Sequence, residues 1–113
     1  MRTLKLKIND KDYKLAMTRE SIKYLENVGF ILEKFDEKPI TYYDLIWQSL
    51  FIANHKDVNP NLAMKMMETY EKEHGANMVA KVVKFGIDEY TAFILALADT
   101  NSKETEELEI VEE

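Results

Sequence analysis

The residues able to do acid–base or metal chemistry are few in this chain and are poorly placed for it. The chain has two histidines and no cysteine, which removes thiolate nucleophiles and thiolate metal sites together. His55 and His74 each lie where a helix is expected to end, and a cationic side chain interacts favourably with the helix dipole there. Capping or solvent exposure is therefore the favoured interpretation of both histidines, over catalysis or metal binding.

The positions of the carboxylates and glycines also predict no catalytic, metal-binding or nucleotide-binding site. Acidic pairs such as Asp88–Glu89 are adjacent in sequence, so on a helix their side chains do not share a face. The three glycines are isolated, so the sequence contains neither a phosphate-binding loop nor a dinucleotide-binding fingerprint. We therefore expect a non-enzymatic protein with no catalytic residues, no cofactor and no bound metal.

Charge is unevenly distributed along the chain. Residues 1–98 contain 14 basic and 14 acidic residues, whereas residues 99–113 contain one lysine and seven acids. A balanced body with an acidic tail disfavours nucleic-acid binding, which requires a basic surface. The basic residues that cluster are Arg2, Lys5, Lys7, Lys11 and Lys14. Alternating lysines on a strand are more typical of edge protection, so we expect no nucleic-acid partner.

The sequence also predicts no membrane contact. No apolar run approaches the roughly 20 residues that a membrane-spanning helix needs. The first residues carry charge and strand-like alternation where a signal peptide would carry an apolar core. We therefore expect the protein to act in the cytoplasm.

Large apolar side chains are the remaining candidates for function. The helices expected over residues 41–54 and 60–74 carry more aromatic and methionine side chains than a domain of 113 residues easily buries. A helix that is apolar nearly all round is either buried or covered by a partner, and methionine suits surfaces that accept varied apolar helices. Core residence is the default for most of these side chains. The candidate partner-binding residues are Tyr43, Trp47, Phe51, Met64, Met67 and Tyr70.

Periodicity predicts the elements that position these side chains. Two alternating segments around the turn at residues 9–12 predict an antiparallel hairpin. Thr18 is a predicted N-cap and Gly29 a predicted end of the first helix. Helical spacing predicts further helices over 41–54, 60–74 and 77–98, with a break near Gly86. The predicted fold is α+β and mostly α: an N-terminal two-stranded antiparallel hairpin packed on a bundle of four to five helices.

We expect one globular domain over residues 1–98, followed by an acidic C-terminal tail over residues 99–113. The tail acids repel one another, and little apolar area offsets the entropy of ordering them, so a mobile tail is predicted. The alternative is that Leu108, Ile110 and Val111 pair as a strand on the basic edge of the hairpin.

The order of these elements resembles that of a known family. A hairpin of the form TLKLKINDKDYKL is followed by a helix carrying SIKYLENVG at residues 21–29, then by a helical body and an acidic C-terminus. This layout resembles the tail assembly chaperones of long-tailed phages and prophages of Gram-positive bacteria. Phe30 departs from the family, in which a polar residue is more frequent at that place.

The resemblance implies a role in tail morphogenesis in the cytoplasm of the bacterial host. Such chaperones bind the long, helical tape measure protein and help to recruit tail tube protein subunits. Because the tape measure protein is long, many copies must bind along it, which favours a homo-oligomer. The alternative function is a small acidic phage regulatory or inhibitory protein that acts on a host DNA-binding enzyme. Neighbouring genes for a tail tube and a tape measure protein would decide for the chaperone.

Overall fold

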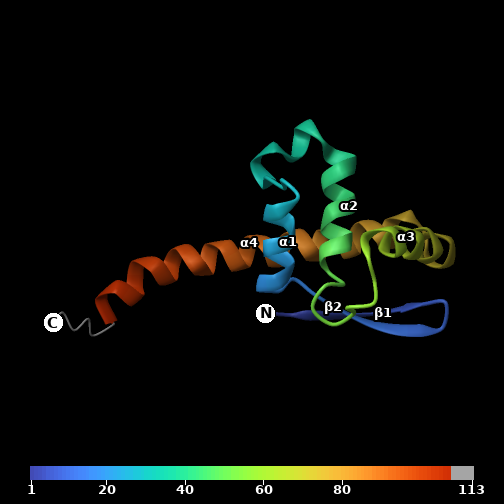
Figure 1. The fold of residues 1–113 in the computed structure, drawn as a ribbon, viewed down its shortest axis with the longest axis horizontal. Coiled ribbons are helices and arrows are strands. Elements are labelled where there is room, and N and C mark those ends of the chain that lie inside the picture. Colours follow the sequence, from blue (N-terminus) through green and yellow to red (C-terminus); the bar gives the residue numbers. More distant parts are fainter. Residues whose placement is uncertain (108–113) are drawn as a thin grey trace.

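The computed structural model describes the backbone of residues 1–107 and the side chains of residues 1–98. Strands β1 (Thr3–Ile8) and β2 (Lys11–Ala16) form an antiparallel two-stranded sheet. The helical elements that follow are α1 (Arg19–Asn27), the 3-10 helix η1 (Leu32–Glu37), α2 (Pro39–Ser49), α3 (Pro60–His74) and α4 (Ala76–Glu107). This arrangement confirms the predicted α+β, mostly helical fold (Figure 1).

The N-terminal hairpin forms as its alternation predicts. Its strands pair in a register that runs from Thr3 opposite Ala16 to Ile8 opposite Lys11. Asn9 and Asp10 have φ values of 51° and 64°, the left-handed conformation that a tight two-residue hairpin turn requires. One face of the sheet is buried through Leu6, Ile8 and Leu15, and the other exposes Lys5, Lys7 and Lys14.

Helix α1 begins and ends at the predicted residues. The Thr18 Oγ1 accepts a hydrogen bond from the Ser21 backbone N–H at 3.1 Å, and the Ser21 Oγ accepts one from the Thr18 N–H at 3.1 Å. This reciprocal capping box satisfies donors that the first helical turn would otherwise leave unpaired. Gly29, with φ +85°, follows the helix in the left-handed conformation typical of a C-terminal cap.

Helix α2 lies at the centre of the core. Ile46, Trp47, Leu50 and Phe51 are fully buried, and the Trp47 indole N–H donates to the Ala63 carbonyl on α3 at 2.8 Å. Figure 1 shows α1 and α2 standing across the long helix α4, with the hairpin on the other side. The buried apolar side chains come from both strands and from α1, α2, α3 and α4, between Leu6 and Val83, so one core unites the hairpin and these helices.

Two boundaries of α2 differ from the prediction. The helix ends at Ser49 and not near Asn54. The N–H groups of residues 50–52 donate to carbonyls three residues back, as in a turn, and the Leu50 carbonyl accepts the Ala16 N–H of β2 at 3.1 Å. The helix begins at Pro39, two residues before the predicted start at residue 41. Proline is favoured in the first turn of a helix because its missing N–H has no partner there.

Helix α4 also differs from the prediction. The predicted break near Gly86 is wrong, because the helix continues through this residue. A Cβ at Gly86 would lie 2.6 Å from Ile46 Cγ2 and 3.2 Å from Leu50 Cδ1, so glycine allows α4 to pack closely on α2. The helix begins at Ala76, one residue before the predicted start, and it continues past the predicted end at Ala98 to Glu107. The predictions for residues 108–113, including the added strand, lie outside the described residues.

Candidate partner-binding surfaces

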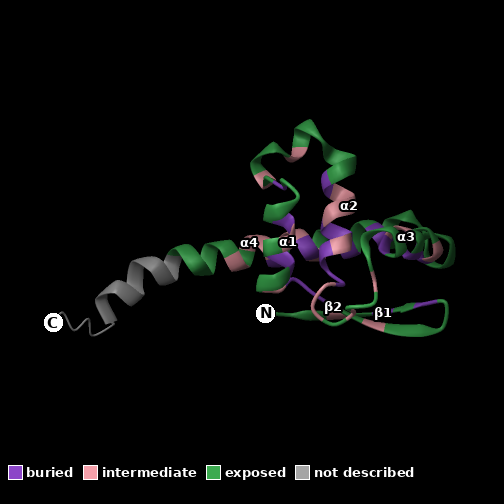
Figure 2. Ribbon diagram, viewed as in Figure 1, coloured by how far each residue is buried: buried purple, intermediate pink, exposed green. Residues whose placement is uncertain are grey.

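The part of α4 that projects beyond the body carries an uncovered apolar surface. Residues 91–98 contain no charged side chain, and the buried residues of α4 lie between Val79 and Glu89. Residues 94–98 on the projecting helix are all exposed (Figure 2). Leu95 is 64% exposed, Leu97 43% and Ile94 39%. Exposed apolar side chains grouped on one helix make this segment a candidate binding surface. We call residues 91–98 the apolar segment.

A hollow of about 290 Å³ lies where the apolar segment meets the body. It is lined by Met1, Met17, Glu89, Ala92, Phe93 and Ala96. Phe93 is half-buried and packs against the core, whereas Ala96 is exposed. The hollow therefore extends the apolar segment onto the body, next to the N-terminus.

Glu89 and Arg2 fix the base of this segment. The Glu89 carboxylate is 7% exposed and accepts hydrogen bonds from the Arg2 backbone N–H and from Arg2 Nε, each at 2.8 Å. Burial raises the pKa of Glu89, but the backbone and side-chain hydrogen bonds from Arg2 and its positive charge outweigh burial and lower the pKa below its ordinary value. The Arg2 guanidinium also lies 5.7 Å from the centre of the Phe85 ring. These contacts fasten the start of the hairpin to α4.

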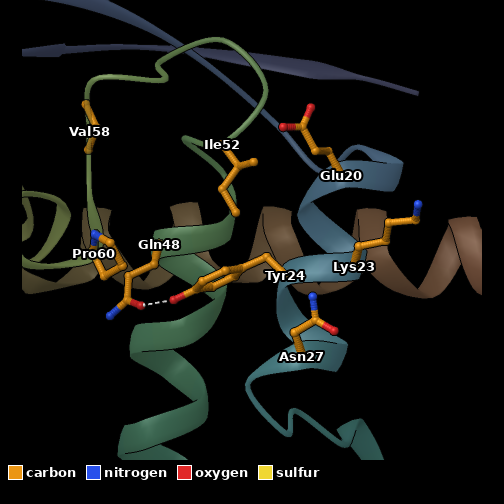
Figure 3. A pocket seen from close by; sticks show the side chains of 8 residues that line it. All are labelled: Glu20, Lys23, Tyr24, Asn27, Gln48, Ile52, Val58 and Pro60. Atoms are coloured by element: carbon orange, nitrogen blue, oxygen red, sulfur yellow. Dashed lines mark hydrogen bonds between the residues drawn. The ribbon is translucent and has the colours of Figure 1, made fainter.

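A second surface is an open groove between α1 and α2 (Figure 3). Its volume is about 410 Å³, and it is lined by Glu20, Lys23, Tyr24, Asn27, Gln48, Ile52, Val58 and Pro60. The Tyr24 hydroxyl reaches across the groove and donates to Gln48 Oε1 at 2.7 Å. Burial raises the pKa of the Tyr24 phenol, so this hydroxyl stays protonated as a donor. Glu20 also pairs with Lys56 on the following loop.

Sequence reasoning missed this groove because its lining residues come from three separate segments. Residues 20–27 lie on α1, Gln48 lies at the end of α2 with Ile52 just after it, and Val58 and Pro60 lie at the start of α3. Their spacing carries no shared motif, so only tertiary packing brings them together.

The structure separates the six sequence-predicted binding residues into two groups. Trp47, Phe51, Met67 and Tyr70 are buried, and the Trp47 ring lies 5.5 Å from the Phe51 ring and 5.9 Å from the Tyr70 ring, centre to centre. These four side chains form core contacts where α2, α3 and the hairpin meet, so a partner does not reach them in this conformation. Tyr43 and Met64 are half-buried and remain candidates.

Both histidines make structural contacts. His74 is the last residue of α3, and its ring lies 4.6 Å from that of Tyr70. His55 is not at a helix end, because α2 stops earlier. Its Nε2 accepts the Lys14 backbone N–H at 3.0 Å, and its ring lies 5.0 Å from that of Tyr13. His55 therefore ties the loop after α2 to the edge of β2.

The described residues offer no metal site and no membrane span. No group of three or more histidine, aspartate or glutamate side chains among them is placed to hold a metal ion. No helix in the described part of the chain has both the length and the apolar character needed to cross a membrane.

Comparison with curated proteins and with solved structures found no match. One family model matches residues 1–111, and its family is described as a domain of unknown function, DUF5055. The match spans almost the whole chain of 113 residues. The protein therefore belongs to the DUF5055 family.

Proposed function

We propose that this protein is a non-enzymatic tail assembly chaperone of a phage or prophage. It acts in the cytoplasm of the bacterial host, where it binds the tape measure protein and helps to recruit tail tube subunits. The observation that carries this proposal is the apolar segment of α4, whose exposed side chains Ile94, Leu95 and Leu97 lie on a helix that projects from the body.

The apolar segment has the chemistry expected for binding a helical client. An exposed apolar stripe on one helix covers the apolar stripe of another, and the anchors recur every three or four residues. A tape measure protein is long and helical, so it offers many such stripes to many copies. The hollow beside Phe93 provides room for a larger client side chain at the base of the segment.

Co-expression with a tape measure fragment tests the proposal. The wild-type protein should keep the fragment in the supernatant and co-purify with it. A triple variant, Ile94→Ser, Leu95→Ser and Leu97→Ser, should lose both effects because it removes the apolar contacts. The matched control replaces three exposed apolar residues elsewhere, Ile31→Ser, Ile40→Ser and Leu62→Ser, and should behave like the wild type.

Circular dichroism should show that both triple variants keep the wild-type helix content. If the wild-type protein neither binds nor solubilises the fragment, the chaperone proposal is wrong. If the control variant loses binding while the α4 variant keeps it, the client binds elsewhere on the molecule.

A further inference from the structure

We propose that the outer edge of strand β1 binds an extended, acidic segment of another protein, which adds to the sheet as a third strand. Three observations support this proposal: the direction of the backbone groups along β1, the covering of the opposite edge of the sheet and the row of lysines beside β1. The site uses neither the apolar segment of α4 nor a tape measure protein, so it goes beyond the proposed function.

The register of the hairpin determines which backbone groups of β1 point away from β2. Lys14 donates its backbone N–H to His55 Nε2 at 3.0 Å, so this residue turns its N–H away from β1. In an antiparallel pair, two residues that lie opposite each other turn their N–H and C=O groups either both inward or both outward. Lys5 lies opposite Lys14. Lys5, and Lys7 two residues further on, therefore present their N–H and C=O groups on the outer edge of β1.

The fold covers the outer edge of β2 and leaves that of β1 open. The loop after α2 makes three hydrogen bonds to the backbone of β2, through Leu50, Asn54 and His55. Among the described residues, no group hydrogen-bonds to the outward N–H or C=O of Lys5 or Lys7. Buried backbone groups almost always have a partner, so these groups face water. An open edge of this kind can pair with another strand.

Lysine side chains lie beside the open edge. Lys5, Lys7 and Lys14 are exposed on the same face of the sheet, and none of the three forms an ion pair within the described part of the chain. Lys5 lies directly opposite Lys14, and like charges in this position destabilise an antiparallel pair. The three lysines outnumber the acid on this face of the hairpin, Asp12. Acidic side chains of an added strand would lie next to the β1 lysines and offset this repulsion.

Charge and hydrogen bonding favour an acidic protein segment over other occupants. A second copy that paired through β1 would place its own lysines beside those of the first copy, and like charges repel. A nucleic acid phosphate accepts hydrogen bonds but offers no donor to the outward C=O groups. An extended peptide supplies both N–H and C=O groups at the spacing of a strand. Its alternate residues should be apolar, because they would extend the face that carries Leu4 and Leu6.

Titration of the full-length protein with a synthetic peptide tests the proposal. The probe is the capped peptide Thr-Glu-Val-Glu-Val-Glu-Thr, in which acidic and β-branched residues alternate. Isothermal titration calorimetry should show saturable binding that weakens as salt is added. The same peptide with lysine in place of glutamate should not bind. The acidic peptide with an N-methylated backbone should not bind either, because it keeps the charge but cannot donate hydrogen bonds.

Amide hydrogen exchange followed by NMR locates the binding. In the free protein the Lys5 and Lys7 amides should exchange quickly, whereas those of Leu6 and Ile8, which face β2, should be protected. The acidic peptide should slow the exchange of the two lysine amides. Binding that protects other amides and leaves these two unchanged would overturn the proposal, as would the absence of saturable binding.

Substitutions on β1 separate the contribution of charge from that of hydrogen bonding. The double variant Lys5→Gln and Lys7→Gln should weaken binding at least about threefold. The matched control, Lys65→Gln with Lys81→Gln, removes two exposed lysines elsewhere and should bind like the wild type. Lys5→Pro removes an N–H that β2 does not use, a change that edge strands tolerate, and it should weaken binding more than Lys5→Gln does. Circular dichroism should show that all variants keep the wild-type helix content.

Two further results would assign the edge to a different occupant and overturn the proposal. A single-stranded oligonucleotide that binds as tightly as the acidic peptide would show a general site for polyanions. A dimer of the wild-type protein that dissociates in the Lys5→Pro variant would show that a second copy occupies the edge. Neither result bears on the chaperone proposal, which is tested by client solubility and by substitutions on α4.

Discussion

Glu89 is a buried carboxylate whose charge is matched by two hydrogen bonds from Arg2 at 2.8 Å. A buried charge is stabilising when its partners are present and costly when one of them is lost. The side chain joins residues 87 positions apart in sequence, so its contribution to stability comes from tertiary structure.

Glu89→Gln should destabilise the fold by about 1.5–3 kcal/mol, the typical value of hydrogen bonds to a charged group. Because the folded pKa lies below the ordinary value of 4.5, the charged form stabilises the fold above pH 4.5. This contribution falls as the pH drops below 4.5 and is lost once the pH falls through the folded pKa. Urea denaturation of wild type and variant across this range measures the difference.

The matched control is Asp88→Asn, which removes an exposed carboxylate paired with Lys84 on the same helix. Exposed pairs of this kind contribute about 0.3–0.5 kcal/mol. An equal loss of stability in the two variants would contradict the structural role of Glu89.

Gly86→Ala should destabilise the fold by about 1–3 kcal/mol, the usual cost of overpacking. Alanine is the better helix former by about 1 kcal/mol, but its Cβ would lie 2.6 Å from Ile46 Cγ2, a methyl group on a fully buried side chain. The same substitution in an Ile46→Ala background should cost clearly less, because the clashing methyl is absent. Thermal unfolding of the four proteins completes this double-mutant cycle; equal costs in the two backgrounds would exclude the clash.

Helix α1 depends on its N-terminal capping box. Thr18→Ala removes the oxygen that accepts the Ser21 N–H and should cost about 1 kcal/mol. Thr69→Ala is a suitable control, because the Thr69 hydroxyl only donates back to the Lys65 carbonyl within α3. Urea denaturation should show a clear loss for the first variant and little or none for the second.

The hairpin turn has the left-handed backbone conformation that its length requires, but Asp10 occupies a position where glycine is favoured. Asp10 has φ 64°, where glycine is favoured because it has no Cβ. Asp10→Gly should therefore stabilise the protein by a few tenths of a kcal/mol up to about 1 kcal/mol. A lower midpoint of thermal unfolding for Asp10→Gly would show that the aspartate suits the turn better than glycine does.

The Asn9 N–H donates to the Glu73 carboxylate of α3 at 3.0 Å, so Glu73→Gln should weaken the docking of this turn.

The whole molecule divides into a body that contains the core and a helix that extends beyond it. The buried apolar residues of the described chain lie between Leu6 and Val83, and Phe93 packs against them from the base of the apolar segment. Removal of residues 101–113 should therefore leave the midpoint of thermal unfolding unchanged when the protein is monomeric.

Calorimetry of the truncated protein measures this effect. The full-length protein is the reference. A large drop in the unfolding temperature of the monomer would show that the C-terminal residues contribute to the fold, as an added strand would.

Some features of this protein follow from the sequence alone because local interactions specify them. Alternation and turn residues define the hairpin, and Thr18 and Gly29 bound α1, since the relevant partners lie within a few residues of each other. The body's balanced charge also follows from composition. These predictions needed no knowledge of which elements meet in space.

Other features depend on contacts between distant residues, so only the tertiary structure decided them. Gly86 locally favours a helix break, yet its missing side chain makes room for α2. Trp47, Phe51, Met67 and Tyr70 resemble a binding surface in sequence but are buried, because α2 and α3 turn these faces toward each other. The groove between α1 and α2 combines three segments without a shared motif. The exposure of Ile94 and Leu95 follows from the direction in which α4 leaves the body, and periodicity does not specify that direction.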